Sequence, residues 1–114
     1  MRARWHFLRE AGGLTLARLL PPRFDFAVTT TLGPGDALRI AHQIRQDLWR
    51  ALQAVRGFSP VVRLAPVAQG WAVTAGGRVA QPLPAQLVQV AQNTLENPAN
   101  RARWARQAMR RRMV

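Results

Sequence analysis

Residues 24–57 read FDFAVTTTLGPGDALRIAHQIRQDLWRALQAVRG, and the apolar periodicity changes within this stretch. Alternate side chains fall on one face of an extended segment: Phe24, Phe26, Val28, Thr30 and Leu32. This alternation predicts a β-strand over residues 24–32. Residues 33–35 then break the strand, and Asp36 is a typical helix N-cap. Apolar residues recur at spacings of three and four up to Gly57, which predicts a helix over about 36–56.

The polar side of this helix is expected to face solvent, and it carries Gln43, Gln46, Asp47, Arg50 and Gln53. Trp49 falls on one flank of the apolar face and Trp71 in a later strand. Both tryptophans are therefore expected in the core or at its edge.

A second β region is expected over residues 59–80. Val62 and Leu64 indicate a strand, residues 68–70 a turn, and residues 71–75 the next strand. Gly76-Gly77 predicts a tight hairpin turn into a short strand over residues 78–80. Helices are expected from Pro84 to Glu96 and again from residue 97, with Asn97 as the cap.

The order β-α-β-β-(β)-α-α predicts an α+β fold, in which helices cover one face of a small mixed or antiparallel sheet. The length of 114 residues suits one domain. We expect the core at residues 24–96, flanked by a basic N-terminal extension (1–23) and an arginine-rich C-terminal helix (97–114). The last helix has a thin apolar side and six arginines between residues 101 and 112.

The charge balance is strongly positive. The chain has 17 basic and 5 acidic residues, a net charge of +12, and every basic residue is arginine. The absence of lysine is typical of GC-rich codon usage, but the excess of positive charge is not explained in this way. It predicts an anionic partner: nucleic acid, anionic lipid or an acidic protein surface.

Few residues offer catalytic chemistry. The chain has no cysteine, and neither of its histidines, His6 and His42, has a second metal ligand at a usual spacing. Ser59 is the one serine and precedes proline, without a nucleophile elbow. We therefore expect a protein that is not an enzyme and that holds no metal or cofactor.

No uncharged apolar run approaches the roughly 18–20 residues of a membrane-spanning helix. Residues 1–20 are rich in arginine and poor in acid, as in targeting or lipid-binding segments, but they lack serine and Gly12-Gly13 interrupts a helix. The absence of cysteine favours a reducing compartment, and we expect a cytoplasmic protein. The sequence does not determine its oligomeric state.

The candidate binding residues lie at the two ends of the chain, where tryptophan is interspersed with arginine. Tryptophan beside arginine can stack on unpaired bases or anchor a protein interface. The candidates are Arg2, Arg4, Trp5 and Arg9 at one end, and Arg101, Arg103, Trp104, Arg106, Arg110, Arg111 and Arg112 at the other.

These residues favour a nucleic-acid-binding module that acts through its arginine-rich termini. The alternative is an accessory or assembly subunit that docks on an acidic surface of a larger complex. No helix-turn-helix, RRM, KH or zinc-finger signature supports the first hypothesis, and the helix at 36–56 has few arginines: Arg39, Arg45, Arg50 and Arg56.

Overall fold

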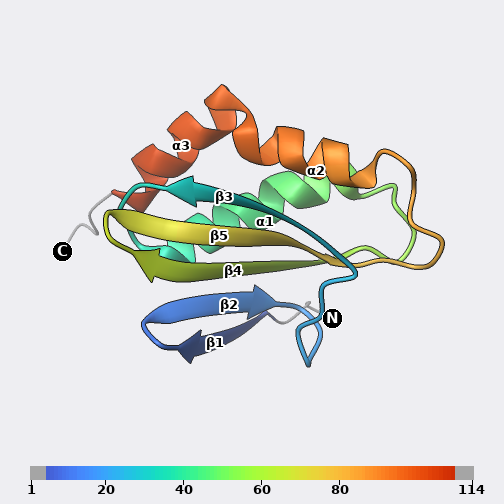
Figure 1. Ribbon diagram of the computed structural model, residues 1–114, viewed down its shortest axis with the longest axis horizontal. Helices are drawn as coiled ribbons and strands as arrows, with labels where there is room; N and C mark the ends of the chain where they lie inside the picture. The colour runs from blue at the N-terminus through green and yellow to red at the C-terminus, as the bar shows by residue number, and fades with distance from the viewer. Residues whose placement is uncertain (1–4, 110–114) are drawn as a thin grey trace.

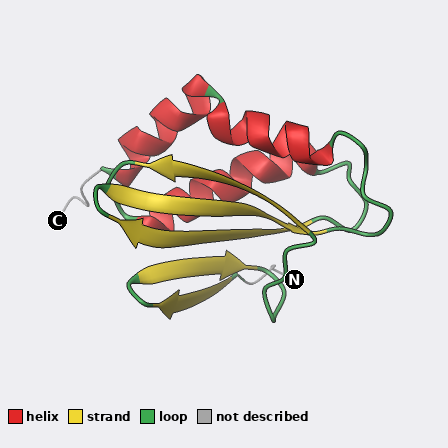
Figure 2. Ribbon diagram, in the orientation of Figure 1, coloured by secondary structure: helices red, strands yellow, loops and turns green. Residues whose placement is uncertain are grey.

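The computed structural model describes residues 5–109, which form a five-stranded sheet with three helices on one face (Figures 1 and 2). The strands are β1 (His6–Glu10), β2 (Gly13–Ala17), β3 (Phe26–Leu32), β4 (Ser59–Val67) and β5 (Gly70–Arg78), and the helices are α1 (Ala37–Leu52), α2 (Leu87–Glu96) and α3 (Pro98–Ala108). The sheet order is β1-β2-β4-β5-β3, and every neighbouring pair is antiparallel. The predicted α+β class is confirmed. None of the described helices has the length and apolar character needed to cross a membrane.

The strand and helix expected between residues 24 and 56 are both present. Phe26 and Val28 point into the core, and α1 buries Ile40, Ala41, Ile44 and Leu48 against the sheet. Asp36 caps α1 as expected, because its carboxylate accepts the Arg39 backbone N–H at 2.9 Å. The helix ends at Leu52, earlier than expected, and residues 53–57 continue as tight turns.

The expected hairpin turn at Gly76-Gly77 is wrong, and so is the short strand after it. Both glycines lie inside β5, which runs unbroken to Arg78. A Cβ on Gly76 would lie 2.1 Å from the Phe26 carbonyl oxygen, and one on Gly77 would lie 2.0 Å from that of Ser59. The two glycines therefore allow close approach of the neighbouring strands. The predicted turn at 68–70 does join β4 to β5.

The expected N-terminal extension is also corrected. Residues 6–17 form the β1–β2 hairpin, and β2 pairs with β4 inside the sheet. Leu14 and Leu16 are 2% and 0% exposed. Ala11 and Gly12 both have positive φ, at 52° and 79°, as a tight two-residue turn requires. The glycines that exclude a continuous helix here belong to a hairpin.

Helix α3 is part of the core as well. Asn97 caps it as predicted, since its side-chain oxygen accepts the Asn100 N–H at 3.0 Å. Trp104 and Ala108 are 1% and 6% exposed. Asp47, expected to face solvent, is buried where α1 meets α3 and accepts the Trp104 indole N–H at 2.6 Å. Within residues 98–109 the basic helix is thus a packed element of the domain.

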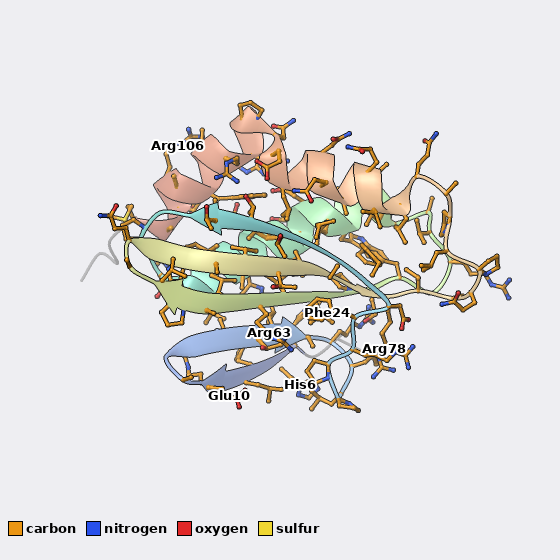
Figure 3. The ribbon with its side chains drawn as sticks, in the orientation of Figure 1. His6, Glu10, Phe24, Arg63, Arg78 and Arg106 are labelled. Atoms are coloured by element: carbon orange, nitrogen blue, oxygen red, sulfur yellow. The ribbon has the colours of Figure 1, made fainter. Side chains whose placement is uncertain are left out.

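The face of the sheet opposite the helices carries a central arginine. Arg63 on β4 donates to the Thr15 hydroxyl at 3.3 Å, and its guanidinium lies 5.3 Å from the centre of the Phe24 ring. Figure 3 shows Phe24 and Arg63 close together where the chain leaves the β1–β2 hairpin for β3. Arg78 of β5 lies on the same face and donates to the Pro21 carbonyl at 2.7 Å, so both strand arginines of this face already have partners in the domain.

Candidate nucleic-acid interface

The arginines of α3 mostly have partners within the domain. Arg101 donates to the Thr30 hydroxyl at 3.0 Å, to the Leu95 carbonyl at 3.1 Å and to the Thr31 carbonyl at 2.8 Å. Arg103 forms an ion pair with the buried carboxylate of Asp47. Both guanidinium groups therefore hold α3 against β3 and α1.

Trp104 does not fit the role of base-stacking residue that its position among arginines suggested. Its ring is buried and its N–H is bound to Asp47, so it is not available to a ligand. Arg106 is exposed on α3, on the side of the molecule away from β1 (Figure 3). Arg2, Arg4, Arg110, Arg111 and Arg112 lie outside the described residues.

Trp5 and Arg9 lie beside α1, where the structure assembles a basic surface. Four side chains of α1 follow one stripe at spacings of four, three and four: Leu38, His42, Arg45 and Trp49. The Phe7 ring of β1 meets the His42 ring edge-on, with centroids 5.8 Å apart. We call the surface between this stripe and residues 5–9 the α1–β1 groove.

At one end of the groove is a hollow of about 260 Å³, which we call the tryptophan hollow; it is lined by Trp5, Arg18, Arg45, Trp49 and Pro60. The Arg45 guanidinium lies 4.7 Å from the centre of the Trp5 ring, at cation–π distance. Trp49 stacks on Phe58, with centroids 6.1 Å apart and ring planes inclined by 10°. Although this contact holds Trp49 in place, the residue remains 40% exposed.

At the other end is a wider hollow of about 700 Å³, which we call the arginine hollow; it is lined by Arg9, Asp36, Leu38, Arg39, His42, Gln43 and Gln107. Asp36 is the one carboxylate among the residues that line the two hollows, against four arginines. Its oxygen already caps α1. The groove therefore presents a net positive charge beside two tryptophans.

A hydrogen bond between side chains joins the two hollows. An Nη2 of Arg45 lies 3.1 Å from Nδ1 of His42. Arginine can only donate, so His42 must accept through an unprotonated Nδ1 and must be neutral. Burial and, to a smaller extent, the positive charge of Arg45 lower the pKa of His42 below its ordinary value. Near neutral pH this bond holds the Arg45 guanidinium between His42 and Trp5.

The sequence interpretation identified Trp5 and Arg9 but missed Arg18, Arg39, Arg45 and Trp49. The stripe on α1 was a signal that could have identified three of them, since Arg45 and Trp49 lie on it and Arg39 is adjacent. What the stripe faces was not predictable, because residues 5–18 were not expected in the sheet.

The described residues contain no group of three or more potential metal ligands among His, Cys, Asp and Glu. Comparisons of the chain with protein-family models, with curated proteins and with solved structures gave no match.

Proposed function

We propose that this protein binds single-stranded nucleic acid in the α1–β1 groove and catalyses no reaction there. The observation that carries the proposal is the tryptophan hollow, where two tryptophans and two arginines surround one small space. Its volume of about 260 Å³ is below the roughly 300–1,000 Å³ of pockets for drug-sized ligands, so it suits one flat ring.

Tryptophan and arginine offer an unpaired base two kinds of contact. The base can stack on an aromatic ring or a guanidinium plane, for roughly 1–3 kcal/mol per base. Arg18 and Arg45 can also neutralise the phosphates on either side of it. A base in a duplex is already stacked and paired, and this is why we propose a single strand as the ligand.

The arginine hollow extends the same surface. If a base of a nucleic-acid strand occupies the tryptophan hollow, the sugar–phosphate backbone can continue along α1 past Arg9 and Arg39. The net charge of +12 adds a long-range attraction for polyanions.

The acid–base groups of the groove already have structural partners. The Asp36 carboxylate accepts a backbone N–H at the start of α1, and neutral His42 accepts from Arg45. This supports binding rather than catalysis as the role of the groove.

The test is the fluorescence anisotropy of a labelled oligouridylate, measured with nuclease-treated protein between about 50 and 200 mM salt. Arg18→Gln is expected to weaken binding and to reduce the slope of log affinity against log salt by about one. Arg106→Gln is the matched control, because it removes the same charge from an exposed site outside the groove. Equal effects of the two variants, or no binding at low salt, would contradict the proposal.

A second candidate is an accessory or assembly subunit that docks on an acidic protein surface. The observation in its favour is an exposed apolar pair beside Arg18: Leu19 and Leu20, each 48% exposed. Binding assays and co-purification distinguish the two candidate functions. An accessory subunit would bind no oligonucleotide and would co-purify from its host with a defined acidic protein.

A further inference from the structure

The two edge strands of the sheet, β3 and β1, differ in whether their outward backbone groups have partners. At the β3 edge, the Thr29 carbonyl accepts from the Gln92 side chain at 3.2 Å, and the Thr31 carbonyl accepts from Arg101 at 2.8 Å. Side chains of α2 and α3 thus occupy carbonyl groups that a further strand would need. At the opposite edge, β1 has no second strand beside it among residues 5–109. An edge of this kind is a template for pairing with another chain.

The hairpin turn determines which backbone groups of β1 point outward. The two-residue turn at Ala11-Gly12 closes with a hydrogen bond between Glu10 and Gly13, which are partners in the register. Bonded and non-bonded pairs alternate along an antiparallel ladder. Leu8 therefore bonds to Thr15, and the N–H and C=O groups of Phe7 and Arg9 point away from β2.

We propose that β1 pairs in antiparallel fashion with β1 of a second copy of this chain, about a two-fold axis at Leu8. In this register Phe7 of each copy lies opposite Arg9 of the other. The two-fold axis generates two such pairs, and the residues of each pair exchange backbone N–H···O=C hydrogen bonds. The result is one continuous ten-stranded sheet with the helices of both copies on the same side. The dimer does not rest on the proposed nucleic-acid function, although it places Arg9, which lines the arginine hollow, at the contact between the copies.

The side chains of β1 are complementary to themselves in this register. His6 lies opposite Glu10, and these groups attract whenever the imidazole is protonated. Phe7 lies opposite Arg9, which places a cation beside an aromatic ring. Leu8 lies opposite its own copy on the axis. Moving the axis to Arg9 would instead place two guanidinium groups opposite each other.

The exposed surface of β1 also favours a second copy. Phe7 is 47% exposed and Leu8 is 42% exposed, although they alternate to opposite faces of the strand. Figure 3 shows His6 and Glu10 towards the two ends of β1, the outermost strand of the sheet in the described part of the chain. Two five-residue strands make a small interface between highly positive copies. Dimerisation is therefore expected to be weak and to strengthen with salt, opposite to the binding of nucleic acid.

Sedimentation equilibrium of the nuclease-treated full chain tests this inference across a range of concentrations at moderate salt, which screens the repulsion between whole copies more than the contacts between opposite side chains. The average mass is expected to rise towards that of a dimer. Leu8→Arg, which puts two cations on the axis, is expected to weaken dimerisation about fivefold. Leu19→Arg is the matched control, because it adds the same charge at a similarly exposed leucine outside β1 and should dimerise like the wild type.

A charge exchange keeps the test decisive if Leu8→Arg disturbs folding. His6→Glu alone places two carboxylates opposite each other, and Glu10→Arg alone replaces the carboxylate opposite His6 with a cation, so each should weaken the dimer. The double variant restores an opposite-charge pair and should recover it. A wild type that stays monomeric at every concentration, equal effects at Leu8 and Leu19, or no recovery in the double variant would overturn the inference.

Discussion

Residues 5–18, which include the β1–β2 hairpin, and helix α3 both combine tryptophan with arginine, but the fold uses them in opposite ways. In α3, Trp104 is buried and Arg101 and Arg103 bind carbonyl and carboxylate groups of the domain. Beside β1, Trp5 and Arg18 line an open hollow whose lining contains no acid. Arginine density therefore does not locate a binding surface; the acceptors that the fold places beside each guanidinium decide its role.

The largest expected effect comes from removing the acceptor that α3 depends on. Asp47→Ala leaves the Trp104 N–H and the Arg103 guanidinium without their carboxylate, and should lower the free energy of unfolding by about 3 kcal/mol. Urea denaturation measures this loss. Glu96→Ala is the control, because its carboxylate is 3.8 Å from Arg101 and half exposed, and it should cost under about 1 kcal/mol. Similar losses in both variants would show that the Asp47 cluster does not hold α3.

Next in size is the stacking contact in the groove. Trp49→Leu should weaken oligonucleotide binding by about 1–3 kcal/mol, because the half-exposed ring provides a face for a base. Titration by fluorescence anisotropy measures the change. Val88→Ala, at an exposed apolar position of α2, is the control and should bind like the wild type. An unchanged affinity in Trp49→Leu would remove the tryptophan hollow from the interface.

A smaller effect separates the two uses of arginine. Arg101→Gln should lower stability by about 1–2 kcal/mol, because it removes hydrogen bonds to three groups, and should leave the salt slope of nucleic-acid binding unchanged. Arg18→Gln should do the reverse. Urea denaturation and anisotropy on the same two proteins test this. If Arg101→Gln reduced the salt slope instead, α3 would belong to the interface after all.

The smallest effect is the pH dependence of stability that arises from His42. Its pKa is lowered in the folded protein, so the unfolded chain binds a proton more readily below about pH 6.5. Stability should therefore fall as the pH drops from 7 to 5. The Asp25 carboxyl, whose pKa is lowered chiefly by its hydrogen bond to Arg23, loses its contribution in a more acidic range. His42→Gln should flatten the curve between pH 5 and 7, and an unchanged curve would contradict this assignment.

Local sequence patterns correctly predicted those helices and strands whose sequence signal lies within the element itself. The alternation at 24–32, the Asp36 cap and the Asn97-Pro98 start of α3 are all short-range features; the cap and the helix start are present, and the strand begins two residues later, at Phe26. The five-residue strands β1 and β2 were missed because so short an alternation is weak, and it becomes clear only when β4 lies beside it.

The candidate site was predictable only in part for the same reason. Trp5 and Arg9 were identified from composition, but their neighbours on α1 are brought to them by the sheet. Trp104 shows the converse case. Nothing in the sequence of α3 indicates that the indole N–H of Trp104 donates to Asp47, 57 positions earlier in the chain.

The contact between the two ends of the helical layer has a consequence for biosynthesis. The Asp36 N–H donates to the Ala108 carbonyl, and Gly35 lies so close to Ala108 that a Cβ would approach its side chain to 2.5 Å. The start of α1 is therefore completed by a residue translated much later. A ribosome-bound chain can form the β1–β2 hairpin early, but the core closes only after residue 108 has left the exit tunnel. Stalled chains ending before Trp104 should remain protease-sensitive.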